Sequence, residues 1–127
     1  MEAIIRRSHD HPALVEKALE ECRAKHLTPD ALGDRLTRLR DQWPELAPKL
    51  RDQLLPVGQL RSLLRQAHCP TRPEDIGLTL TQLRESYLTA GHIRRRYTVF
   101  DIVHEAGLLN TIVDDIFSPG GPWETSE

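Results

Sequence analysis

The chain has 127 residues, about the length of a single domain. Its formal charge of -2 argues against a dedicated nucleic-acid-binding domain, because such domains are normally basic. The two cysteines, Cys22 and Cys69, are too few for a disulfide framework, and no apolar run approaches the roughly 20 residues that cross a membrane. We therefore expect a cytoplasmic chain with no nucleic-acid and no membrane partner.

Prolines mark the starts of several expected helices. Pro12 and Pro29 each precede an apolar pattern of helical spacing, and proline suits the first helical turn because its missing N–H would have no partner there. Trp43 precedes Pro44, a position that disfavours helical backbone, so we expect one helix to end there. Pro48 is expected to kink the next helix or to delay its start. The expected helices lie at residues 11–26, 28–43, 43–55, 55–68, 79–90, 98–106 and 111–117.

Capping signals place several helix ends. Thr79 and Thr98 are each followed three residues later by a side chain that completes a capping box. Gly107 is expected to end the preceding helix in a left-handed conformation. Thr28 and Asn110 are expected to cap the starts of two further helices.

Apolar residues recur at helical spacing, and no segment has a convincing strand pattern. We predict an all-α bundle of about six or seven short helices. It forms a single helical domain over residues 12–117, between a flexible leader at residues 1–11 and a disordered tail at residues 118–127. The predicted core side chains are Val15, Ala18, Leu19, Cys22, Leu32, Leu36, Leu39, Leu46, Leu50, Leu54, Val57, Leu60, Leu63, Leu64, Ala67, Leu83 and Tyr87.

Three consecutive arginines, Arg94, Arg95 and Arg96, precede Tyr97 and the start of a helix. Guanidinium groups and the free N–H groups of a helix start both bind anions, so an anion-binding site is one interpretation. Because the helix dipole disfavours positive charge at that end, we favour helix docking through ion pairs with downstream acids. The candidate acids are Asp101, Glu105, Asp114 and Asp115. Nucleic-acid binding is a third interpretation, but the last 27 residues contain six acids and no Lys or Arg.

The sequence contains no recognisable catalytic or metal-binding motif. The His-Asp-His triplet at residues 9–11 alternates in direction, and His68 and Cys69 are adjacent rather than spaced as ligands. Cys22 lies on an apolar helix face, where an inert buried thiol is expected. We therefore predict no catalytic, cofactor-binding or metal-binding residue in this chain.

The segment HIRRRYTVFDIVHEAGLL, residues 92–109, resembles the C-terminal signature of bacterial and archaeal sn-glycerol-1-phosphate dehydrogenases. Upstream, the Trp-Pro-Glu-Leu at residues 43–46 and the Leu-Pro at residues 55–56 occur in the same order as in that family. The connector AHCPTRPEDIGL at residues 67–78 is also similar to the family's pattern. The resemblance extends over about residues 12–109.

The resemblance implies a relation to the iron-containing alcohol dehydrogenases and glycerol dehydrogenases. A complete member has an N-terminal α/β dinucleotide-binding domain and an all-helical C-terminal domain, and it reduces dihydroxyacetone phosphate with NAD(P)H for phospholipid metabolism. Its divalent metal (Zn, Ni or Fe), held by one aspartate and two histidines, polarises the carbonyl as a Lewis acid. Those cofactor and metal motifs lie upstream of the region that matches, so none of their residues is assigned to a position here.

The chain is therefore expected to correspond to the distal part of the helical domain, and to be structural rather than catalytic on its own. It would expose apolar surface, so we expect self-association or binding to a dehydrogenase N-terminal half. The alternative interpretation is a stand-alone helical protein–protein interaction module.

Overall fold

The computed structural model describes residues 2–8, 10–93 and 95–124. Within these ranges the chain is helical and has no strand, which confirms the predicted all-α bundle of short helices. In chain order the elements are α1 (Glu2–Ser8), α2 (Pro12–Lys25), α3 (Pro29–Gln53), α4 (Val57–Gln66), η1 (Pro73–Ile76), α5 (Leu80–Thr89), η2 (Ala90–His92), α6 (Val99–Glu105) and α7 (Leu109–Phe117).

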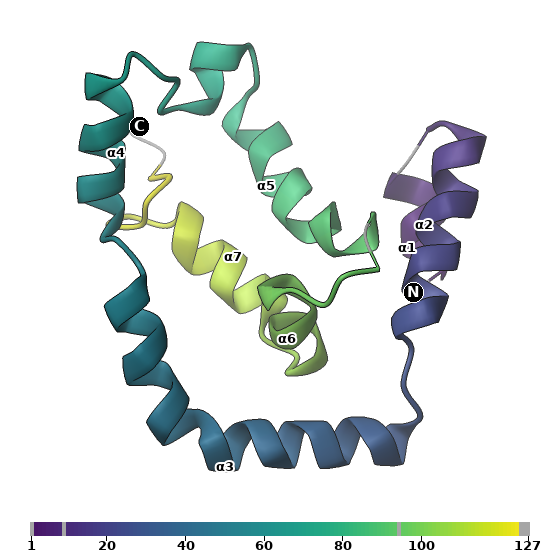
Figure 1. Cartoon of the computed structure of the whole chain (residues 1–127). Helices are drawn as coiled ribbons and strands as arrows, with labels where there is room; N and C mark the ends of the chain where they lie inside the picture. Colours follow the sequence, from purple (N-terminus) through teal and green to yellow (C-terminus); the bar gives the residue numbers. More distant parts are fainter. Residues whose placement is uncertain (1, 9, 94, 125–127) are drawn as a thin grey trace.

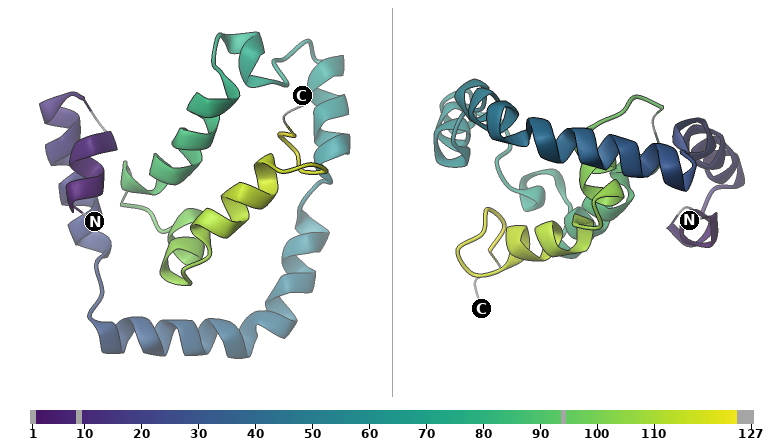
Figure 2. Two further views of the ribbon diagram at one scale, coloured as in Figure 1. Left: turned by 180° about the vertical axis from the view of Figure 1, so that it is seen from behind. Right: turned by 90° about the horizontal axis from the view of Figure 1, so that it is seen from below.

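The bundle is open, because α3 and α4 run around its periphery (Figure 1). We call these two helices the arm. From α2 the chain follows α3 and α4 around the outside, then returns inward through η1 and α5. Helices α5 and α7 contact each other inside the curve of the arm, and η2 contacts α2. The view from behind shows the same path of the arm, and in the view from below α3 crosses in front of the central helices (Figure 2).

A buried apolar cluster joins α1 to α2. Its members are Ile5, Val15, Ala18, Leu19 and Cys22. The α2 residues in this cluster are those that the sequence predicts for the core. Ile5 lies in the predicted flexible leader, yet it is 0% exposed. Residues 2–8 of the predicted leader form a short helix whose apolar side chain Ile5 packs against the apolar face of α2.

A second group of apolar contacts joins the three C-terminal helices. The Tyr87 ring meets the Phe100 and Phe117 rings edge-on, with centroids 6.0 and 5.8 Å apart. Such edge-to-face pairs are favourable because the positive ring edge meets the negative ring face. Val113 of α7, four positions before Phe117, is almost fully buried, with 1% of its surface exposed. These contacts hold α5, α6 and α7 together inside the arm.

The arm differs from the sequence prediction at its two internal prolines. The predicted break at Trp43 is absent, and α3 continues through Pro44 and Pro48 to Gln53. Proline removes a helical hydrogen bond and its ring crowds the preceding turn, so a helix that contains it bends. Figure 1 shows this bend in the second half of α3, which turns the chain towards α4.

Most of the predicted helix caps are present. The Thr28 side chain accepts a hydrogen bond from the Ala31 amide at 3.3 Å, and Thr79 and Thr98 form capping boxes. Gly107 has the expected left-handed conformation, with φ of 71°. The predicted Asn110 cap is wrong, because α7 starts at Leu109 after an uncapped Leu108.

Residues 118–124 differ from the predicted disordered tail, while residues 125–127 lie outside the described ranges. The Trp123 indole N–H donates to the Tyr87 hydroxyl at 3.0 Å, and the Arg61 guanidinium lies 5.0 Å from the centre of the indole ring system. Arg61 also donates to the Pro122 carbonyl at 2.5 Å. One amphipathic side chain, Trp123, thus anchors this segment against α4 and α5.

Candidate functional site

Arg95 connects the arginine-rich loop to α2. Its guanidinium lies 3.1 Å from Glu20 Oε1 and 3.3 Å from Glu21 Oε2. Arg94 lies outside the described residues, and the side chain of Arg96 is exposed. Because two carboxylates already occupy the Arg95 guanidinium, this geometry favours the docking interpretation of the loop over the anion-binding one.

Tyr97 connects the same loop to the arm. Its hydroxyl donates to Glu105 Oε2 at 2.5 Å, and the Arg35 guanidinium lies 4.6 Å from its ring centre. Arg35 also pairs with Glu105 at 2.9 Å. Burial, followed by the hydrogen bond to Glu105, raises the pKa of Tyr97, so its hydroxyl remains a donor at neutral pH. The three residues link the first half of α3 to α6.

The acids predicted to pair with the arginines have other partners. Asp101 binds Lys25, Glu105 binds Arg35, and Asp114 binds Arg84. Arg95 pairs with Glu20 and Glu21 instead of these acids, because the loop turns towards α2. Sequence proximity therefore did not identify the partners.

A largely buried ion pair joins Lys25 to Asp101. Lys25 Nζ is 2.6 Å from Asp101 Oδ1 and donates to the Gly91 carbonyl at 2.6 Å. The other Asp101 oxygen accepts from the amide and hydroxyl of Thr98 at 2.7 and 2.9 Å. Burial acts to raise the pKa of Asp101, but the hydrogen bonds from Lys25 and Thr98 outweigh it and the pKa is lowered. Asp101 is therefore ionised at neutral pH and joins α2, η2 and α6.

The sequence signal for this ion pair was incomplete. Asp101 is recognisable as the capping-box residue of Thr98, which accounts for only one of its oxygens. Lys25 ends α2 and is separated from Asp101 by 76 positions. No local pattern relates residues so far apart, so sequence reasoning missed Lys25.

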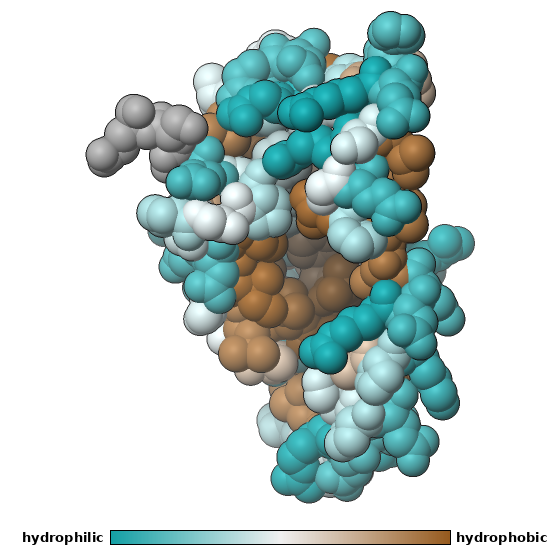
Figure 3. Space-filling view, turned by 90° about the vertical axis from the view of Figure 1, so that its left-hand side faces the viewer, coloured by the Kyte–Doolittle hydropathy of each residue, from teal (hydrophilic) through white to brown (hydrophobic). Residues whose placement is uncertain are grey.

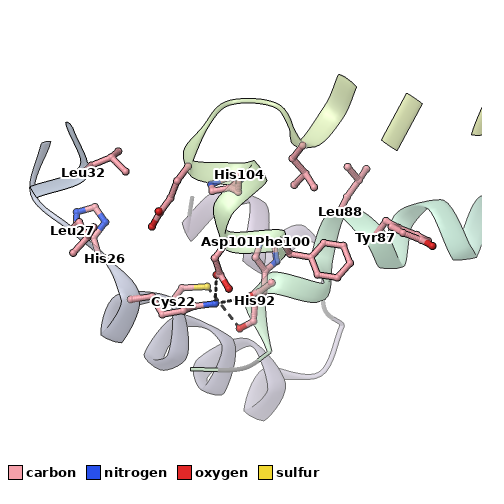
Figure 4. A pocket seen from close by; sticks show the side chains of 14 residues that line it. Cys22, His26, Leu27, Leu32, Tyr87, Leu88, His92, Phe100, Asp101 and His104 are labelled. Atoms are coloured by element: carbon pink, nitrogen blue, oxygen red, sulfur yellow. Dashed lines mark hydrogen bonds and ion pairs between the residues drawn. The ribbon is translucent and has the colours of Figure 1, made fainter. Parts of the chain in front are cut away.

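A cavity of about 260 Å³ opens beside this ion pair (Figure 4). Its apolar wall consists of Leu27, Leu32, Tyr87, Leu88, Phe100 and Leu109, and its polar lining consists of Cys22, Lys25, His26, Gly91, His92, Asp101, His104 and Glu105. The charged groups here are neutralised in pairs, Lys25 with Asp101 and Arg35 with Glu105. The cavity therefore has room for apolar groups but no excess charge to select a charged ligand.

The cavity contains no activated nucleophile. Burial raises the pKa of the Cys22 thiol, although the positive charge of Lys25 opposes this effect. The thiol donates weakly to the His92 carbonyl, at 3.8 Å between sulfur and oxygen. Since the thiolate is the reactive form, Cys22 behaves as a core residue, as its place on the apolar face of α2 predicts.

Large apolar side chains are exposed along the arm and the short connection between its two helices, and we call them the arm face. It consists of Trp43, Leu50, Leu54, Leu55, Val57, Leu60 and Leu63. Leu60 and Leu63, both predicted to be core residues, are each 46% exposed because no other helix covers α4. No residue of α3 or α4 is buried. Viewed from the side on which α4 lies, apolar surface gathers in a hollow between hydrophilic rims (Figure 3).

No family model, curated protein or solved structure matches this chain. The dehydrogenase resemblance of residues 12–109 therefore rests on the quoted sequence motifs alone.

In the described part of the chain, no three His, Cys, Asp or Glu side chains are grouped in a way that could hold a metal ion. Over the same residues, no helix has both the length and the apolar character needed to cross a membrane. The exposed apolar side chains of the arm face are suited to apolar contact.

Proposed function

We propose that this chain is a structural, non-catalytic helical module that completes its apolar core by association with another polypeptide. The observation that supports this proposal is the arm, whose two helices contain no buried residue. Five of the seven exposed apolar side chains of the arm face lie on these helices, and the other two, Leu54 and Leu55, lie in the connection between them. Contiguous apolar surface of this kind is rare on proteins that act as monomers.

The total surface of the chain supports the same proposal. Its accessible surface is 9614 Å² at a mass of 14.5 kDa. A compact monomer of that mass exposes about 6,900 Å², so the excess is roughly 2,700 Å². A standard protein–protein interface buries about 800 Å² on each partner. The open arm thus leaves more surface unpaired than one ordinary interface covers.

A second candidate function makes this module the distal helical part of a glycerol-1-phosphate dehydrogenase-like enzyme. The observation that favours it is that the resembling segments coincide with defined elements. The connector at 67–78 contains η1, which is followed by the left-handed Gly77, and Thr98 with Asp101 caps α6. In that case a separate N-terminal half supplies the NAD(P) site and the divalent metal, and the present chain buttresses that half in the cytoplasm.

The test is to express the chain alone and together with the nucleotide-binding half of a glycerol-1-phosphate dehydrogenase. Mass and thermal stability are then measured over a wide range of concentration. We expect an assembly larger than 14.5 kDa in at least one case, with a melting temperature that rises with concentration. A monomer in both cases, with a radius of gyration near the roughly 14 Å of a compact chain of this length, would refute the proposal. Hydride transfer from NADH to dihydroxyacetone phosphate by the chain alone, with Zn²⁺ present, would refute its non-catalytic part.

A further inference from the structure

The occupant of the arm face can be named from the charge and surface of the chain itself. We propose that it is a second copy of this chain, in a symmetric homodimer that places α4 of one copy against α7 of the other. This inference rests on the proposed function, since it assigns the polypeptide with which the module associates.

The first argument is charge complementarity within one chain. Residues 54–72, which contain α4, include three arginines and no acid. Residues 99–124, which contain α6 and α7, include five acids and no Lys or Arg. A chain with a basic segment and an acidic segment complements its own copy. In a two-fold dimer the basic segment of each copy contacts the acidic segment of the other, so the favourable contact forms twice.

The second argument is that each segment has an exposed charged side chain that can form an ion pair with another copy. Arg65 on α4 and Asp115 on α7 are both exposed, and neither has an ion-pair partner among the described residues. Within one chain the direct link between α4 and the C-terminal segment is made by Arg61, through the Pro122 carbonyl and the Trp123 ring. Asp114, the other acid of α7, already pairs with Arg84, so Arg65 and Asp115 are the two groups available to meet across an interface.

The third argument is the amount of surface. An obligate homodimer buries about 1,000–2,500 Å² on each copy, and the interfaces of this class are more apolar than transient ones. The roughly 2,700 Å² by which each chain exceeds a compact monomer is sufficient for such an interface. The arm face supplies its apolar part, and a net charge of only -2 gives little repulsion between copies.

Sedimentation equilibrium of the purified chain gives the mass and the dimer dissociation constant. The chain is expected to be a dimer that dissociates on dilution. Leu54→Glu, on the arm face and 70% exposed, should raise the dissociation constant by about tenfold or more. Ile76→Glu is the matched control, because Ile76 is 61% exposed but lies in η1, outside the arm. It should leave the dissociation constant within about threefold of its original value.

A charge reversal tests which helices meet. Arg65→Glu and Asp115→Arg should each weaken the dimer, and the double variant should recover most of the loss if the two residues face each other across the interface. Both side chains are exposed, so circular dichroism should show unchanged helicity in every variant. Full additivity of the two effects, or a dimer sensitive to Ile76→Glu but not to Leu54→Glu, would overturn the proposed arrangement.

The oligomeric state separates this inference from the proposed function. A chain that stays monomeric at all concentrations overturns the homodimer. If that monomer then forms a defined complex with a dehydrogenase nucleotide-binding half, or with an unrelated partner through the arm face, the proposed function stands without the homodimer. A monomer that binds neither the dehydrogenase half nor another partner overturns both the homodimer and the proposed function.

Discussion

Lys25 Nζ lies 2.6 Å from Asp101 Oδ1, and this contact joins the end of α2 to the first turn of α6. Both side chains are largely buried, with exposed fractions of 13% and 11%. Removing one partner of a buried ion pair costs more free energy than the intact pair contributes, because it leaves the other charge buried and unpaired. This contact therefore constrains how the N-terminal helices pack against the central ones.

Replacing Asp101 with Asn should therefore lower the stability of the fold. Asn keeps the size of the side chain and can still accept from Thr98, but it leaves the Lys25 charge without its carboxylate. We expect a loss of about 1–3 kcal/mol in the free energy of unfolding, measured by urea denaturation at fixed protein concentration. Asp41→Asn is the control, because Asp41 is 60% exposed and pairs only with its neighbour Arg40. Equal effects of the two variants would contradict the role given to Lys25 and Asp101.

The same ion pair predicts how stability depends on pH. The pKa of Asp101 is lowered in the folded chain, so its ionised form stabilises the fold above the ordinary aspartate pKa of about 3.9. That contribution is lost as the pH falls below this value and through the lower folded pKa. The stability difference between the original chain and Asp101→Asn should thus be constant near neutral pH and shrink in acid. A difference that grows on acidification would show that the folded pKa is raised instead.

The two neighbouring isoleucines of α1 test whether the N-terminal segment is part of the fold. Ile5 is 0% exposed within the α1–α2 cluster, whereas Ile4 is 50% exposed. Ile5→Ala should cost about 2–4 kcal/mol through lost burial and the cavity left behind. Ile4→Ala should change stability by about 0.5 kcal/mol or less, as surface substitutions do. Similar small effects of both, in thermal melts, would mean that the segment is a flexible leader as the sequence predicts.

Trp123 tests the anchoring of the C-terminal segment. Trp123→Phe and Tyr87→Phe each remove the hydrogen bond between the indole N–H and the tyrosine hydroxyl. Each should cost about 0.5–1.5 kcal/mol, and the double variant should cost little more than either alone, because both remove the same bond. Fully additive losses in a denaturation experiment would indicate that the two groups do not interact.

Glycine substitutions distinguish a crowded turn from an open helix surface. A Cβ on Gly121 would lie 2.5 Å from the carbonyl oxygens of Asp115 and Ile116, whereas nothing lies within 4 Å of a Cβ on Gly58. Gly121→Ala should therefore release the anchored segment, seen as faster proteolysis after α7. Gly58→Ala, inside α4, should raise stability by about 0.5–1 kcal/mol because alanine favours helical backbone. Resistance of Gly121→Ala to proteolysis would contradict the close turn.

Local chemistry determined much of the secondary structure. The capping boxes of Thr79 and Thr98 and the left-handed Gly107 are visible in the sequence because each involves groups only a few residues apart. The buried face of α2 follows from its helical spacing for the same reason. The continuation of α3 through Pro44 was not predictable, since proline makes both a break and a bend acceptable locally.

Only the tertiary structure decided which residues meet and which stay exposed. Lys25 with Asp101, Arg35 with Glu105 and Trp123 with Tyr87 are separated by 36 to 76 positions, and no local pattern encodes such pairs. The apolar spacing of α4 marks a face that can be buried, but whether it is buried depends on another surface being present. Sequence periodicity therefore predicted the face of the arm, and the open path of the chain left that face exposed.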